Sequence, residues 1–109
     1  MKFTNVSDGT GEAAVTKVTP ANLSGAPSRV RIVRIHASTF GMGVDILWDA
    51  TADVLSWHIP TDMDVCQDFE GFGGLWNNAG AGITGLIQFT TVGHTAGDRY
   101  SIILELVKD

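Results

Sequence analysis

The feature of this sequence that most constrains its fold is a series of short apolar runs with a period of two, separated by clusters of glycine, proline and aspartate. Alternation at a period of two is typical of a strand that has one face in a core. No window shows a helical period over three turns. The pattern predicts an all-β chain with strands at 13–19, 29–38, 44–49, 54–59 and 83–91, at 99–107, and a shorter one near 65–69.

The last quarter of the chain predicts a β-hairpin around which the other strands are organised. Its arms are 83–91 and 99–107, and the segment 92–98 between them contains two glycines and an aspartate, which favour a turn. One face of the second arm is apolar and the other is mixed. We therefore expect the earlier strands to pack against this hairpin.

Strand spacing also predicts the architecture. The run at 29–38 is rich in β-branched residues and carries apolar side chains on both faces, which predicts a central strand. Strands separated by turn clusters at this spacing are typical of an antiparallel β-sandwich or jelly roll, here of six to eight strands. We expect one domain over 13–109, preceded by an N-terminal arm at 1–12.

The arm contains only two bulky apolar residues, Phe3 and Val6. Segments of this kind are disordered unless something holds them down, and a neighbouring subunit often does so. Two interpretations are therefore equally open: an arm that lies on another subunit, or a frayed terminus.

Composition excludes several classes of partner. The 109 residues include 12 acidic and 7 basic side chains, a net charge of −5, which argues against nucleic acid or an anionic membrane as the main partner. Charged residues are 17% of the chain, against about 25% in typical domains. Subunit contacts would hide the uncharged surface, so we expect an assembled protein, with a weakly charged monomer as the alternative.

Compartment is also constrained. The single cysteine, Cys66, cannot form an intramolecular disulfide. The beginning of the chain lacks the apolar core of a signal peptide, and no apolar run approaches the roughly 20 residues of a membrane span. We expect a protein that is made in the cytoplasm and is not exported by that route.

Candidate chemistry is sparse. One acidic cluster consists of Asp62, Asp64, Asp68 and Glu70. A calcium site there is conceivable, but the spacing does not match an EF-hand, and a solvated acidic loop fits better. The arginines of the 29–38 run are expected to pair with these acidic loops rather than to bind nucleic acid.

No catalytic set converges in the sequence. The three histidines, His36, His58 and His94, have no second metal ligand at a familiar spacing. There is no Gly-x-Ser-x-Gly motif, and Cys66 has no adjacent basic residue that would lower the pKa of its thiol. The chain is therefore expected to be non-enzymatic, with no catalytic residue, no metal and no cofactor.

The segment 71–82 is glycine-rich yet carries large apolar side chains. Such a loop either folds back on the body of the protein or presents its apolar groups to a partner. Trp76 stands beside two amide side chains, which suits sugar stacking or a protein contact, whereas Trp48 and Trp57 share faces with aliphatic residues and are expected in the core. The candidate partner-binding residues are Phe3, Val6, Phe72, Leu75, Trp76, Asn77 and Asn78.

Four stretches resemble small structural proteins of tailed bacteriophages: 7–12, 44–50, 84–91 and 97–102. The resemblance implies a virion protein, specifically a capsid decoration (cement) protein that forms a symmetric oligomer, commonly a homotrimer, and sits on the outer shell against the major capsid protein. It transfers no functional residue to this chain. The alternative is a carbohydrate-binding module, or another tail or connector component of a virion.

Overall fold

The computed structural model describes residues 1–7, 9–25, 30–48, 54–75 and 86–108. These residues form eight strands and two short 3-10 turns, and they include no α-helix. The elements are β1 (Lys2–Val6), β2 (Val15–Val18), η1 (Pro20–Asn22), β3 (Val30–Phe40), β4 (Gly43–Trp48), β5 (Val54–Ile59), β6 (Asp64–Asp68), η2 (Glu70–Phe72), β7 (Ile87–Val92) and β8 (Arg99–Lys108). The all-β prediction is confirmed.

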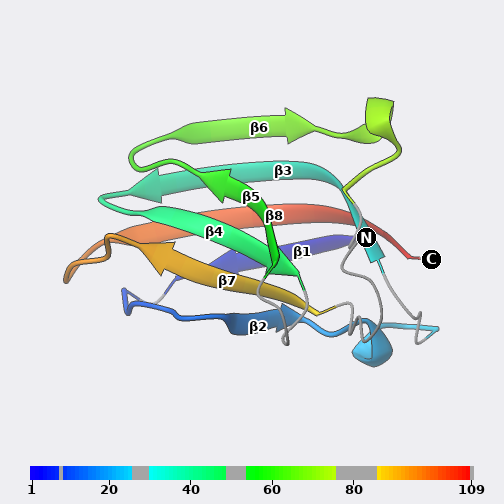
Figure 1. Cartoon of the computed structure of the whole chain (residues 1–109), viewed down its shortest axis with the longest axis horizontal. Helices are drawn as coiled ribbons and strands as arrows, with labels where there is room; N and C mark the ends of the chain where they lie inside the picture. The colour runs from blue at the N-terminus through cyan, green and yellow to red at the C-terminus, as the bar shows by residue number, and fades with distance from the viewer. Residues whose placement is uncertain (8, 26–29, 49–53, 76–85, 109) are drawn as a thin grey trace.

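The strands form two four-stranded antiparallel sheets that face each other (Figure 1). Sheet A has the order β1-β8-β3-β6 and sheet B the order β2-β7-β4-β5. The first strand pairs with the last, and the pairing continues inward as β1/β8, β2/β7, β3/β6 and β4/β5. The chain therefore has the pairing of one long hairpin that is rolled around a common core. This pairing is that of an eight-stranded jelly roll, so the predicted sandwich is confirmed.

The predicted C-terminal hairpin is wrong. β7 belongs to sheet B and β8 to sheet A, so the segment between them crosses from one sheet to the other. Gly93 and Gly97 adopt positive φ angles of 73° and 92° along this crossing. The apolar faces of the two strands therefore meet across the core, where the rings of Phe89 and Tyr100 lie 5.9 Å apart, edge to face. Alternation showed that both segments are strands with a buried face, but it did not specify which strands pair.

β3 lies between β8 and β6, as the prediction of a central strand requires. A bulge also explains why apolar residues occur at both odd and even positions of β3. The register with β8 shifts between Ile32 and Arg34, which marks a bulge. Val30 and Ile32 are buried before the bulge, and Ile35 and Ala37 are buried after it. One strand thus directs residues of opposite sequence parity into the same core.

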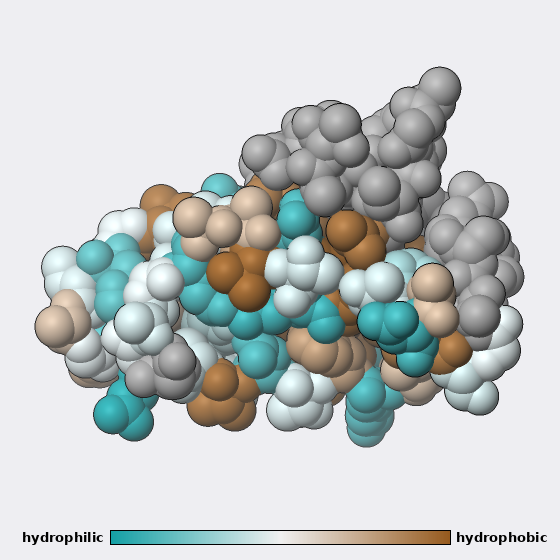
Figure 2. All heavy atoms as spheres, turned by 90° about the horizontal axis from the view of Figure 1, so that it is seen from below, coloured by the Kyte–Doolittle hydropathy of each residue, from teal (hydrophilic) through white to brown (hydrophobic). Residues whose placement is uncertain are grey.

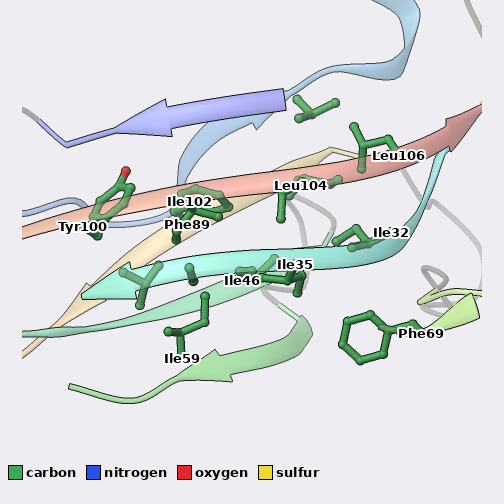
Figure 3. Packing of buried hydrophobic residues seen from close by; sticks show 14 of the residues in the cluster. Ile32, Ile35, Ile46, Ile59, Phe69, Phe89, Tyr100, Ile102, Leu104 and Leu106 are labelled. Atoms are coloured by element: carbon green, nitrogen blue, oxygen red, sulfur yellow. The ribbon is translucent and has the colours of Figure 1, made fainter. Parts of the chain in front are cut away.

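The core lies between the two sheets (Figure 3). Sheet A contributes residues such as Ile35, Ile102 and Leu104, and sheet B contributes Ile46 and Phe89; all five are fully buried. Because the fold removes these side chains from water at about 25 cal/mol per Å² of apolar surface, this layer supplies most of the stabilisation.

The N-terminal segment is held by its own chain. β1 pairs with β8 in a register that runs from Lys2 opposite Glu105 to Val6 opposite Ser101. The amino group of Met1 donates a hydrogen bond of 2.8 Å to the carbonyl oxygen of Leu106. Residues 2–6 therefore form an edge strand of sheet A, and neither a frayed terminus nor an arm on another subunit describes them.

Candidate interaction surface

The outer face of sheet A carries its side chains in rows across the strands, because directly opposed residues point to the same side. One row is Lys2, Glu105, Arg34 and Asp68, which alternate in charge. Arg34 donates hydrogen bonds of 2.6 Å to Glu105 and 3.0 Å to Asp68, and the Lys2 amino group lies 3.9 Å from Glu105. The prediction that an arginine of this strand pairs with acidic residues is confirmed for Arg34.

These contacts keep the row ionised. The Arg34 guanidinium lowers the pKa of Glu105, and a backbone N–H from Glu70, followed by Arg34, lowers the pKa of Asp68. Both carboxylates in turn raise the pKa of the Arg34 guanidinium. Because the two cations and two anions balance, the row presents no net charge to a partner.

Next to the charged row, the outer face of sheet A carries smaller side chains and has a shallow hollow. A hollow of about 300 Å³ opens over β3, β6 and β8, and its lining includes His36, Ser38, Cys66 and Ile103. His36 stands directly opposite Cys66 in the ladder. A shallow, mixed surface of this kind suits contact with another macromolecule better than enclosure of a small molecule.

The end of the sandwich opposite the two termini carries exposed apolar residues. The turns that follow β1, β3, β5 and β7 gather there, on the left of Figure 1. Val6, Phe40, Met63 and Val92 lie at or next to these turns, and Phe40 is 69% exposed. Viewed from the side of β1 and β2, by contrast, polar and apolar side chains are interspersed over the coloured surface (Figure 2).

Hollows flank Phe40 on both sides. The first, of about 190 Å³, is lined by Val6, Arg99 and Tyr100 among others. The second, of about 420 Å³, is lined by Asp62, Met63 and Asp64 together with the end of β3. We call these residues the turn-end surface: Val6, Phe40, Asp62, Met63, Asp64 and Arg99.

Hydrogen bonds hold the turns beneath this surface. Asp62 accepts a 2.7 Å bond from the backbone N–H of Gly41. Asp98 is buried and accepts bonds from the backbone N–H and the hydroxyl of Thr95, at 2.7 and 2.9 Å. These donors, the N–H first, lower the pKa of Asp98. Phe40 therefore projects from a well-anchored turn.

The acidic cluster disperses over several partners. Asp62 accepts from Gly41, the Ser38 hydroxyl donates a 2.7 Å bond to Asp64, and Asp68 pairs with Arg34. Over the part of the chain that the structure describes, no three His, Cys, Asp or Glu side chains gather in a way that holds a metal ion. Their arrangement is therefore that of turn and ladder contacts.

The three histidines lie apart from one another. His36 is on sheet A, with its Nε2 3.5 Å from Glu105, and His58 contacts Asp45 on sheet B. His94 is in the turn before β8, and its Nδ1 lies 3.5 Å from the position that a Cβ would take at Gly11. They do not converge on a single site.

The candidate partner-binding residues lie in different parts of the fold. Phe3 is half-buried, and its ring meets Phe89 edge to face at 6.5 Å. Val6 is exposed at the turn end. Leu75 packs against the core, and its backbone exchanges hydrogen bonds of 2.7 and 3.0 Å with Ile32. Phe72 belongs to η2.

Of the remaining predictions about the glycine-rich segment and the tryptophans, the structure bears on one, that for Trp57. Trp76, Asn77, Asn78 and the side chain of Trp48 lie outside the described residues. The predicted core role of Trp57 holds: it packs against the core, with its ring 4.9 Å from that of Phe69.

The sequence did not identify Phe40 as a candidate contact residue, because its position before Gly41 indicated a turn. The available signal was a large apolar side chain directly before Gly41, at the end of a strand. Its outward direction depends on the bulge in β3, which reverses the parity of every later position in that strand.

Comparison of the chain with protein-family models, curated proteins and solved structures found no match. Within the described ranges, no helix has the length and apolar character needed to cross a membrane. The function is therefore inferred from the fold and the surface.

Proposed function

We propose that this chain is a non-enzymatic structural protein of a tailed-phage virion: a capsid decoration (cement) protein that binds the major capsid protein, self-associates as a homotrimer and stabilises the head shell. The observation that carries the proposal is the eight-stranded jelly roll with an open, self-neutralised outer face on sheet A. Jelly rolls recur in viral capsid proteins and in lectins. The phage resemblance favours the first of these over the second.

The outer face of sheet A suits a protein partner of this kind. Its charged row is internally paired, and the adjoining rows carry small or aliphatic groups such as Ser101 and Ile103. A neighbouring protein can cover the charged row without leaving any of its four charges unpaired. A shell-stabilising protein needs this property rather than turnover. Asp64, which also lines the hollow, pairs with no described cation and would need a polar partner from that neighbour.

Co-sedimentation with undecorated heads assembled from the cognate major capsid protein tests the proposal. We expect saturable binding and a higher temperature of head disruption. Ile103→Lys places a charge on the outer face of sheet A and should reduce binding at least tenfold. Val15→Lys makes the same kind of change on the exposed edge strand of sheet B and should leave binding unchanged. Absence of binding by the unmodified protein would contradict the proposal.

A carbohydrate-binding module is the second candidate, favoured by the occurrence of the jelly roll in lectin domains. Against it, the described side chains on the outer face of sheet A include no tryptophan or tyrosine, and the exposed aromatic ring there, Phe40, lies at the turn end of β3. A glycan array separates the two. Specific glycan binding that Trp76→Ala abolishes in a folded protein would support this second candidate.

A further inference from the structure

The turn-end surface has two unlike sides, arranged across sheet A in the strand order β1-β8-β3-β6. Val6 and Arg99 lie on the β1/β8 side. Asp62, Met63 and Asp64 lie on the β6 side. Phe40, at the end of β3, stands between them and borders both hollows. The surface is thus a ridge with one basic and one acidic flank.

The charged side chains of the two flanks form no ion pair with other described residues. Arg99 is exposed and forms no ion pair with a described residue, whereas Lys2, Lys17 and Arg34 all do. On the other flank, Asp62 and Asp64 accept hydrogen bonds from neutral donors and pair with no described cation. Each flank therefore offers the charge that the other lacks.

The apolar residues follow the same division. Val6 is 64% exposed on the basic flank, Met63 is 45% exposed on the acidic flank, and Phe40 is 69% exposed between them. Exposed apolar residues of this size that cluster at one end of a small domain are typical of a contact surface rather than of a surface that stays in water. The hollows of about 190 and 420 Å³ beside Phe40 leave room for side chains of a neighbour.

We infer that copies of this chain associate head to tail through the turn-end surface, with the Arg99 flank of one copy against the Asp62 and Asp64 flank of the next. Val6 then meets Met63, and Phe40 of every copy lies near the rotation axis. In this arrangement each copy uses one flank toward each neighbour, so the contact is heterologous, and a closing rotation repeats it into a ring. A two-fold dimer would satisfy the same charges by pairing both flanks reciprocally, and a mass of two chains in solution would therefore reject the ring. This inference deepens the proposed function, since it names the surface for self-association.

A second copy is the occupant that the charges favour. Complementary potentials across an interface guide association and set its register. Here both complementary halves belong to the same molecule, on the same end, and only another copy of this chain is certain to bring the matching half. A capsid subunit has no such requirement, and it remains available to bind the outer face of sheet A.

Light scattering behind a sizing column, run with the full chain over a range of concentrations, tests the inference. The unmodified protein should have a mass about three times the 11.6 kDa of one chain, as a closed ring in the proposed homotrimer requires. Arg99→Glu and Asp64→Lys should each shift the mass to that of the monomer, because each opposes like charges in every contact. The double variant Arg99→Glu/Asp64→Lys should recover part of the oligomer, since the carboxylate introduced at position 99 of one copy then faces the ammonium group introduced at position 64 of the next, while Asp62 is unchanged.

Two further variants separate this contact from general effects. Lys2→Glu changes the net charge by the same amount as Arg99→Glu but lies in the charged row, so it should keep the oligomer. Phe40→Ser should give the monomer through loss of apolar contact. Circular dichroism and thermal unfolding show which variants are folded, and only folded variants are compared.

A strict monomer at all concentrations overturns the inference, as does an Arg99→Glu variant that keeps the oligomer or a double variant no better than the single ones. These outcomes differ from failure of the proposed function. A monomer that binds heads rejects the ring and the homotrimer but retains capsid decoration. An oligomer that binds no heads retains the ring and rejects capsid decoration.

Discussion

At the scale of single residues, Gly41 lies in the turn between β3 of sheet A and β4 of sheet B, where the Asp98 side chain leaves no room for a Cβ. Its φ angle of 80° lies in the region that favours glycine, and a Cβ placed there would lie 2.1 Å from a carboxylate oxygen of Asp98. Asp98 cannot move freely, because its carboxylate accepts two bonds from Thr95. The turn after β3 and the turn before β8 therefore constrain each other, and both support the turn-end surface.

Gly41→Ala is accordingly expected to destabilise the fold through two additive causes. Left-handed backbone strain costs about 1–2 kcal/mol for a residue with a Cβ, and displacement of the Asp98 carboxylate adds to it. Urea unfolding measures the loss. The matched control is Gly93→Ala, with φ of 73° and open space around the position, which incurs the strain alone. Equal losses for the two variants would show that the contact with Asp98 has no energetic role.

At the scale of elements, β1 is the segment whose role changes most between sequence and structure. The sequence leaves open an arm that lies on another subunit or a frayed terminus, but β1 covers the edge of β8 through a five-residue ladder. Phe3 also closes the core beside Phe89. An uncovered β8 would expose unpaired backbone groups and an apolar face, both of which favour aggregation.

Deletion of residues 1–6 should therefore destabilise the domain rather than remove a dispensable arm. Loss of the ladder, at about 1 kcal/mol per hydrogen bond, and of the Phe3 contact should cost about 3 kcal/mol or more. Thermal unfolding measures the change, with Lys2→Ala as a control that keeps the ladder and loses only an exposed ion pair at 3.9 Å. A truncated protein with unchanged stability would show that β1 contributes little to the fold.

At the scale of the whole molecule, the jelly roll joins segments that are far apart in the sequence. The amino group of Met1 bonds to Leu106, 105 residues away, and β2 pairs with β7. Such pairs form only after a large part of the chain has been ordered, which slows folding because the loop entropy is lost before the contacts form.

We expect refolding in milliseconds to seconds, the range of domains dominated by non-local strand pairs. Stopped-flow fluorescence after dilution from urea measures the rate, at a protein concentration low enough to keep self-association out of the kinetics. A helical bundle of similar length, which folds in microseconds to milliseconds, provides the comparison. Refolding in microseconds would indicate that local contacts, rather than the long-range ladder, control the rate.

The sequence by itself determined that the chain is all-β, where most of its strands lie, and that the 99–107 segment has one apolar face, which the structure buries at Ile102 and Leu104. The physical reason is that alternation is a local property, because successive side chains of a strand point to opposite faces. It also identified Val6 as a candidate contact residue, and the structure leaves Val6 exposed.

Strand partners were decided only by the tertiary structure. Backbone hydrogen bonds between strands are nearly independent of side-chain identity, so the sequence could not show that β7 and β8 belong to different sheets or that β1 pairs with β8. The bulge near Val33 likewise decided that Phe40 faces outward. The turn-end surface exists only because the fold brings Val6, Phe40 and Met63, which are distant in sequence, to one end of the sandwich.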